Sequence, residues 1–161
     1  MKSYQFTFSQ KLPVSVNEAW KFFSSPNNLA KITPADMAFT VTSDPGQLKT
    51  MYPGMLITYK VSPVLNIKLN WMTEITHIEE EKYFIDEQRF GPYKFWHHQH
   101  HFEKIEGGTL MNDILTYGLP FGPIGVLANT LFVGKKVQEI FEFRRKKVIE
   151  LFGDYTTASE T

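Results

Sequence analysis

Length and composition limit the kinds of protein that this sequence can encode. Its 161 residues suffice for one domain with a substantial buried core. Lysine plus arginine and aspartate plus glutamate both number 17, so the formal net charge is +0 and no overall field attracts nucleic acid or an anionic membrane. The absence of cysteine excludes disulfides, thiol nucleophiles and thiolate metal ligands. With no apolar run of the roughly 18 residues that a membrane span needs, we expect a cytoplasmic protein without membrane insertion.

The N-terminal part predicts a strand followed by two short helices. Aromatic and polar residues alternate over 4–9, which is typical of a half-buried strand. Ser15 and Glu18 have the spacing of a capping box, so a short helix is expected to begin after Ser15. Ser25 followed by Pro26 predicts a second helix of one or two turns, because proline is favoured at the first helical position.

The middle of the chain predicts six further strands. Three are expected near 39–41, over 55–61 and over 67–78, where apolar residues alternate with polar ones. Three more lie within Tyr83–Tyr117 and are separated by the short turn segments 91–93 and 106–108. Connections this short join antiparallel neighbours, so the strands are expected to form a meander.

The C-terminal part predicts one long helix. A glycine- and proline-rich loop over 118–123 is followed by a helical pattern that runs to Phe152 and ends at Gly153. We therefore predict a single domain over 1–153 and a polar tail over 154–161. The helix has a broad apolar stripe made of Ile124, Leu127, Leu131, Val137, Ile140, Phe141, Val148 and Phe152.

Alternation along the central strands places polar groups among aromatic ones on one face. His98 and His100 share a face with Trp96, and His97 and His101 are then expected to face solvent. Aromatic residues make up 15% of the chain, enough to fill a wide core or to line a pocket. The complete face comprises Trp71, Phe84, Asp86, Gln88, Trp96, His98, His100, Phe102, Met111, Asp113 and Tyr117.

Four interpretations of the polar groups on this face remain open. They can hydrogen-bond one another, as buried polar side chains normally do, or they can orient a ligand in an apolar cavity. His98 or His100, oriented by Asp113, can act as a general acid or base, so these three are the catalytic candidates. The His98-x-His100 pair can also bind a metal with Asp86 or Asp113. Without a fixed third ligand this last pattern is weak, and we expect no metal and no cofactor.

Two other segments each have two interpretations. The four consecutive cations of 144–147 near the end of the long helix favour a solvated face that complements the helix dipole over an anion-binding patch. The loop over 118–123 contains Leu119 and Phe121, which can gate the mouth of a cavity or merely connect the last strand to the helix.

The order of elements and several local motifs resemble the START and polyketide-cyclase-like superfamily, also called SRPBCC, over nearly the whole chain. The segment 90–96 followed by His98, His100 and Phe102 is similar to a bacterial subgroup described only as ligand-binding SRPBCC proteins. The other segments that carry the resemblance are 12–13, 17–20, 22–24, Pro26 with 28–29, Asp113 with Tyr117, and 118–152.

This resemblance implies an α+β protein with the helix-grip fold, in which a seven-stranded antiparallel sheet wraps around a long C-terminal helix and two short helices follow the first strand. It implies a cavity between the sheet and the helix, and binding more firmly than catalysis. The superfamily includes lipid and hormone carriers, cyclase and aromatase enzymes and oxygenase subunits, and it has no universal catalytic motif to transfer.

We therefore expect the chain to bind a small hydrophobic or aromatic molecule in an internal cavity. A cyclase- or aromatase-like enzyme that uses a His/Asp pair, and a protein-interaction module, are the alternatives. The oligomeric state is left open. The expected ligand-binding residues are the eleven of the polar and aromatic face together with Leu127 and Leu131 of the long helix.

Overall fold

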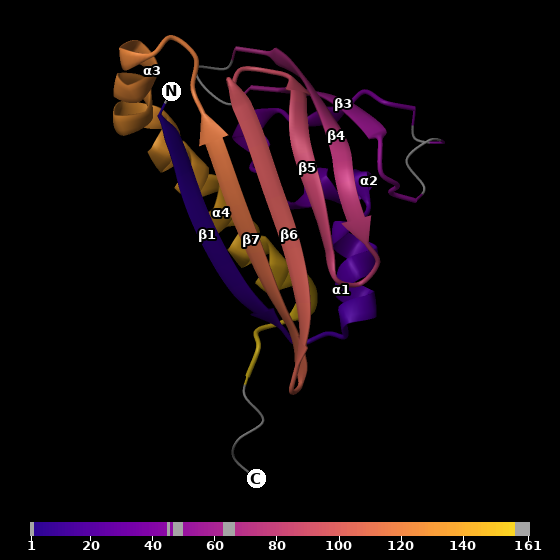
Figure 1. Ribbon diagram of the computed structural model, residues 1–161. Helices are drawn as coiled ribbons and strands as arrows, with labels where there is room; N and C mark the ends of the chain where they lie inside the picture. The colour runs from indigo at the N-terminus through magenta and orange to yellow at the C-terminus, as the bar shows by residue number, and fades with distance from the viewer. Residues whose placement is uncertain (1, 45, 47–49, 63–66, 157–161) are drawn as a thin grey trace.

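Seven antiparallel strands form one sheet in the order β1-β7-β6-β5-β4-β3-β2 (Figure 1). The computed structural model describes residues 2–44, 46, 50–62 and 67–156. The strands are β1 (Ser3–Leu12), β2 (Thr40–Val41), β3 (Met55–Val61), β4 (Leu69–Glu79), β5 (Tyr83–Phe90), β6 (Phe95–Ile105) and β7 (Gly108–Gly118). The helical segments are α1 (Val16–Phe23), α2 (Pro26–Leu29), η1 (Ala30–Ile32), η2 (Ala35–Met37), α3 (Pro123–Ala128), the π-helical η4 (Asn129–Val133) and α4 (Gly134–Phe152).

The first helix begins where the capping signal predicted. The Ser15 hydroxyl accepts a hydrogen bond from the backbone N–H of Glu18 at 3.2 Å, which satisfies one of the free donors of the first turn. Trp20 of α1 is buried with its ring edge-on to Phe84 and Phe102, at centroid distances of 5.9 and 5.6 Å. These contacts close one end of the space enclosed by the sheet.

The strand register brings the polar residues of three neighbouring strands together. Asp86 of β5 lies directly opposite His98 of β6, and His100 of β6 lies directly opposite Asp113 of β7. Directly opposed residues have side chains on the same face of an antiparallel sheet. The four side chains consequently form one compact group on the concave face.

The long C-terminal helix lies across the concave face of the sheet, behind β1, β7 and β6 in the view of Figure 1. The expected helical run over 123–152 is present, but η4 inserts one wide turn into it. Tyr117 anchors this turn to the sheet, because its hydroxyl donates to Asn129 Oδ1 at 2.6 Å. α4 then buries Val137, Phe141 and Val148.

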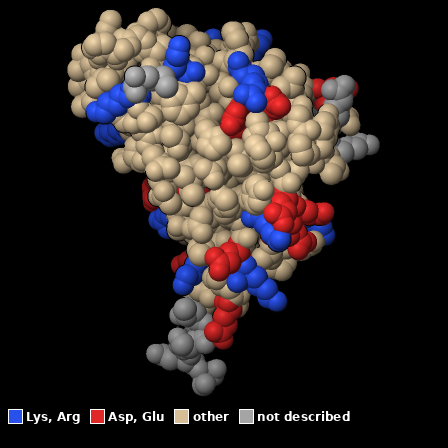
Figure 2. Space-filling model, in the orientation of Figure 1, with Lys and Arg blue, Asp and Glu red and all other residues tan. Residues whose placement is uncertain are grey.

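Charged side chains of both signs are interspersed on the face shown in Figure 2, where many gather at the end that carries the β6–β7 turn. Among the residues that the structure describes, no helix is long and apolar enough to cross a membrane. The end of the predicted polar tail, 157–161, lies outside the described residues, so the division between domain and tail stays a prediction.

Candidate functional site

A cavity of about 470 Å³ lies between the concave face of the sheet and α4. Its walls come from β3, β4, β5 and β6 on one side and from α2, η1 and α4 on the other, and most of the lining is apolar. Six of the residues predicted from sequence to contact a ligand line this cavity: Trp71, Phe84, Asp86, Trp96, His98 and His100.

The other predicted residues on the sheet do not line the cavity. Phe102 and Met111 belong to the solid core around Trp20, because the inner face of the sheet extends further than the cavity does. Tyr117 is fully buried near the opposite end. Gln88 turns to the β5–β6 connection, where its amide donates to the carbonyl of Tyr93 at 2.8 Å. Its polar side chain therefore holds a turn.

Leu127 and Leu131 correct the expectation for the helix. Both are exposed, by 59% and 54% respectively, and neither lines the cavity. The buried positions of this segment are Gly125 and Asn129, and a residue two positions further along a helix lies about half a turn away. The stripe predicted from the sequence was therefore too broad, because Leu127 and Leu131 face away from the sheet.

Three buried side chains, His98, His100 and Asp113, and the partly buried Asp86 form what we call the aspartate–histidine cluster. His100 Nε2 lies 2.9 Å from Asp86 Oδ2 in a hydrogen bond, and His100 Nδ1 lies 2.6 Å from Asp113 Oδ1. His98 Nδ1 lies 3.5 Å from Asp86 Oδ2, and His98 Nε2 lies 3.2 Å from Asp113 Oδ1. The two imidazole centroids are 3.9 Å apart. Each ring thus has one carboxylate on either side.

Burial and mutual attraction act in opposite directions on this cluster. Burial by itself would raise the pKa of Asp113, but the charge and proximity of His100 hold that pKa well below its usual range. Burial would likewise raise the pKa of Asp86, but the contacts of Asp86 with the two histidines lower it. Burial opposes the charged form of His100, but the carboxylates of Asp113 and Asp86 outweigh it and raise the pKa of His100. Burial and the charge of His100 lower the pKa of His98. The cluster favours one charged and one neutral imidazole.

Arg144 belongs to the site and was missed in the sequence. Its side chain lines the cavity, its guanidinium lies 4.9 Å from the ring centroid of Phe141, and its charge contributes to the lowered pKa of Asp86. The neighbouring Arg145 is exposed and pairs with Glu142, as a solvated face predicts. The interpretation of the basic run is therefore wrong for its first member. Arg144 has the helical spacing of the buried stripe, three residues after Phe141, and this signal could have identified it.

A second polar pair lines the cavity on β3 and β4. The Tyr59 hydroxyl lies 2.5 Å from Thr73 Oγ1, and burial holds the pKa of Tyr59 above its usual range. Trp71 Nε1 is buried near them without a hydrogen-bond partner in the described part of the chain. Tyr59 and Thr73 lie within the predicted strands over 55–61 and 67–78, but nothing in the sequence selected them.

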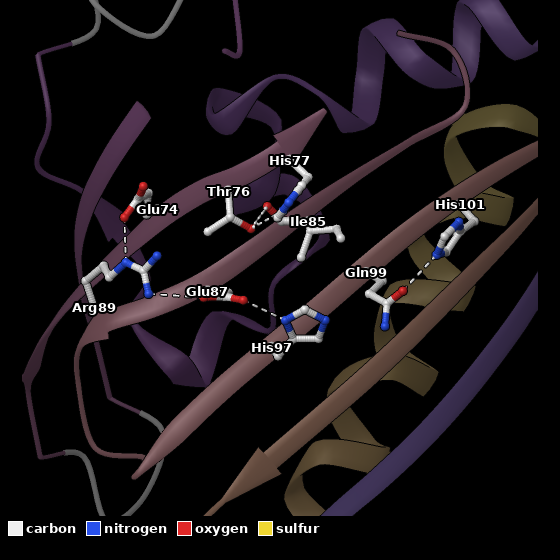
Figure 3. Close-up of polar contacts among 9 residues, drawn as sticks. All are labelled: Glu74, Thr76, His77, Ile85, Glu87, Arg89, His97, Gln99 and His101. Carbon is white, nitrogen blue, oxygen red and sulfur yellow. Dashed lines mark hydrogen bonds and ion pairs between the residues drawn. The ribbon is translucent and has the colours of Figure 1, made fainter. Parts of the chain in front are cut away.

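The alternate histidines of β6 lie on the other face of the sheet, as predicted. Figure 3 shows His97 directed toward Glu87 and His101 directed toward Gln99, with α4 on the far side of the strands. The distances from the ring nitrogens to the acceptor oxygens are 2.8 and 3.1 Å. His98 and His100 are only 4% and 7% exposed, so the two faces of the strand are clearly distinct.

Exposed apolar side chains surround one edge of the cavity. Phe121, Ile124 and Ile67 line it and are nevertheless 79%, 71% and 57% exposed. Phe121 has a positive φ of 66°, which directs the chain out of the β7 strand toward α3. The loop over 118–122 therefore forms part of the cavity rim. Its function as a gate stays a prediction.

Comparisons with known proteins support the fold. No protein-family model matches the chain, and no curated protein does. Among solved structures, protein CV1439 from Chromobacterium violaceum has a TM-score of 0.71 and 8% identity, over 94% of this chain and 98% of that one. Ginseng major latex-like protein 151 from Panax ginseng has a TM-score of 0.67 and 11% identity, over 93% and 97%. Ara h 8.0201 has a TM-score of 0.59 and 14% identity, over 92% and 99%.

This is the helix-grip fold. The antiparallel sheet of seven strands, the short helices after β1 and the long C-terminal helix are common to these neighbours, and the fold class expected from sequence is confirmed. Identities of 8–14% show a shared fold and leave the ligand and the chemistry to be argued from this chain's own residues.

Proposed function

We propose that this chain is a cytoplasmic protein that binds a small hydrophobic or partly aromatic molecule in the cavity between the sheet and α4. The observation that carries the proposal is the cavity itself, about 470 Å³ in volume and lined mainly by apolar side chains. Pockets for small organic molecules have this size and this composition, with a few polar groups that fix the ligand's orientation. The SRPBCC resemblance of the sequence supports the same conclusion.

The polar groups on the cavity wall indicate what else the ligand carries. Trp71 Nε1 is a buried donor without a hydrogen-bond partner among the described residues, and an unmet buried donor costs on the order of 1–3 kcal/mol. Arg144 adds a cation to the same lining. A ligand with a carbonyl, phenolic or carboxylate oxygen would supply an acceptor to either group. Apolar burial would then provide most of the affinity, and the oxygen would set the direction of binding.

A cavity-filling substitution tests this proposal. Ile140 lines the cavity from α4, so Ile140→Trp is expected to weaken binding of the apolar fluorophore 1-anilinonaphthalene-8-sulfonate at least about tenfold, which corresponds to about 1.4 kcal/mol. Leu151→Trp is the matched control, because Leu151 lies on the same helix and is 48% exposed. Equal affinity of the two folded variants would contradict binding in the cavity. If Ile140→Trp alone binds more weakly, native mass spectrometry of the wild-type protein with extracted metabolites would identify the natural ligand.

General acid–base catalysis is the second candidate, because both imidazoles line the cavity and His100 has a carboxylate partner at 2.9 Å. A cyclase- or aromatase-like reaction would use His98 or His100 to move a proton on a polyketide-like carbonyl compound, with Asp113 orienting the ring. Replacing either histidine by glutamine would then abolish turnover of such a compound and leave its affinity largely unchanged. Turnover that survived both substitutions would exclude this function.

An interaction module is the third candidate, because large apolar side chains are exposed on consecutive turns of α3 and η4. Ile124, Leu127, Leu131 and Phe132 are each more than half exposed. Exposed apolar surface of this kind marks contact sites in many soluble proteins. Sedimentation velocity across a wide concentration range would show self-association through this surface, and Leu127→Glu would abolish it.

A further inference from the structure

We propose that Asp86, His98 and His100 also form a binding site for one divalent transition-metal ion at the polar wall of the cavity. The three residues line the same cavity, and one ligand atom from each lies within 4.8 Å of the others. The sequence lacked a fixed third ligand for the His98-x-His100 pair. The β5–β6 register supplies it, because Asp86 lies directly opposite His98.

Two of the distances between these donor atoms match those of ligands that share one ion. Metal bonds to imidazole nitrogen and carboxylate oxygen are about 2.0–2.2 Å long, so neighbouring ligand atoms in tetrahedral or octahedral geometry are about 3.0–3.5 Å apart. Asp86 Oδ2 lies 2.9 Å from His100 Nε2 and 3.5 Å from His98 Nδ1. An ion would replace the hydrogen bond between His100 and Asp86 and would require little movement of the strands.

Asp113 occupies the position of an outer partner for both histidines. Its Oδ1 atom lies 2.6 Å from His100 Nδ1 and 3.2 Å from His98 Nε2, which are the ring nitrogens turned away from Asp86. Histidines that bind metals usually donate their second N–H to a carboxylate, which fixes the tautomer and strengthens the ligand. Unlike the other three, Asp113 does not line the cavity. It therefore holds the rings from behind.

The surroundings of the cluster also favour an ion. Phe84 stacks on His100 with centroids 4.2 Å apart, and Phe141 packs edge-on to His98 at 5.5 Å. An apolar shell limits access of water to the donors. Arg144 is the competing cation, since its charge already acts on Asp86 from the cavity side.

Two imidazoles and one carboxylate make a donor set that suits zinc or ferrous iron. Three protein ligands leave further coordination positions, and we expect an incoming ligand to reach them from the cavity that all three residues line. An oxygen of the organic ligand could occupy one of them. The metal proposal itself does not depend on that ligand, because the three donors come from the chain alone.

The test uses untagged, metal-stripped protein and the metal alone. Titration calorimetry with Zn²⁺ is expected to show one equivalent bound, and Co²⁺ is expected to give the visible absorption of a site with nitrogen ligands. Asp86→Asn and His98→Gln should each weaken Zn²⁺ binding more than about 100-fold. Asp113→Asn should weaken it roughly 10–100-fold, as loss of an outer partner does. Circular dichroism and thermal unfolding establish that each variant is folded.

His97→Gln and His101→Gln are the matched controls, because they remove the same residue type from the same strand on the opposite face. Both should bind Zn²⁺ as the wild type does. In the wild-type protein, Zn²⁺ should shift the ring ¹⁵N resonances of His98 and His100, a readout that needs no variant. The proposal is wrong if the wild type binds no ion, or if the shifts are confined to His77, His97 and His101. Neither result bears on binding of the apolar fluorophore, so the two proposals fail separately.

Discussion

The two faces of β6 carry the same residue type in different environments. His98 and His100 on the inner face are 4% and 7% exposed and share two carboxylates. His97 on the outer face has a side chain that is 34% exposed and contacts Glu87 at 2.8 Å. The His101 ring contacts the amide oxygen of Gln99 at 3.1 Å and lies 5.6 Å from the ring of Tyr83. The residue type is the same at these four positions, so the contrast reflects differences in burial and in partners.

This contrast indicates that the contribution of a histidine–carboxylate pair to folding stability depends on where the pair lies. A pair at the surface contributes about 0–1 kcal/mol, because water competes with the partner. In the interior the partner must replace the lost hydration, so removing it leaves an uncompensated polar group at a cost of about 3–5 kcal/mol. Removing a member of the inner cluster should therefore lower stability much more than removing a member of an outer contact.

The largest expected effect is that of Asp113→Ala, which removes a carboxylate whose side chain is 9% exposed. We expect the free energy of unfolding in urea to fall by about 3–5 kcal/mol in metal-free protein. The outer-face control Glu87→Ala should cost less than about 1 kcal/mol. Similar losses for the two variants would show that burial does not distinguish the faces.

Double-mutant cycles measure the contrast more directly. Replacing His100 and Asp113 by alanine, singly and together, should give an interaction free energy of about 0.5–3 kcal/mol, because each residue depends on the other inside the protein. The cycle for His97 and Glu87 should give less than about 1 kcal/mol. An outer interaction energy as large as the inner one would contradict the comparison.

The same contrast extends to the long helix. Arg144→Ala should lower the free energy of unfolding by about 0.5–2 kcal/mol, through loss of the guanidinium contact with Phe141 and of packing in the cavity wall. The neighbouring Arg145→Ala should leave the unfolding midpoint unchanged, since Arg145 pairs with Glu142 in solvent. Equal midpoints for the two variants would remove Arg144 from the site.

The smallest effect is expected for His101→Gln on the outer face. Its ring contacts Gln99 at 3.1 Å, and a glutamine can hydrogen-bond to water in its place. The free energy of unfolding should stay within about 0.5 kcal/mol of the wild type. A larger loss, measured by the same urea titration, would mean that the outer face contributes to the core.

Local signals in the sequence predicted most of the fold. The Ser15 cap, the alternation along the strands and the short turns each depend on neighbouring residues, and each appears where it was expected. The inward direction of His98 and His100 followed from the same alternation. The function and the individual site residues stay proposals.

The remaining features depend on depth and on distant packing, which alternation does not report. It assigned Phe102 to the correct face but could not show that Trp20 would fill the space beside it. Helical periodicity placed Leu127 in the apolar stripe. It did not show that α3 lies at the end of the sheet, with Leu127 on the exposed side of that helix. Arg144 was hidden in a basic run whose next member, Arg145, is exposed, although its spacing from Phe141 was a signal that the interpretation of the run overlooked.

The opposed pairs of the cluster have a consequence for folding. Asp86 faces His98 and His100 faces Asp113 in only one alignment of β5, β6 and β7. A slip of β6 by one residue would turn His98 and His100 outward and bring His97, Gln99 and His101 to the inner face, so that one aspartate would oppose Gln99 and the other a single histidine. A misaligned sheet would therefore lose the paired contacts of the cluster in addition to the burial of its apolar face. The polar wall of the cavity is also the feature that selects the correct strand alignment.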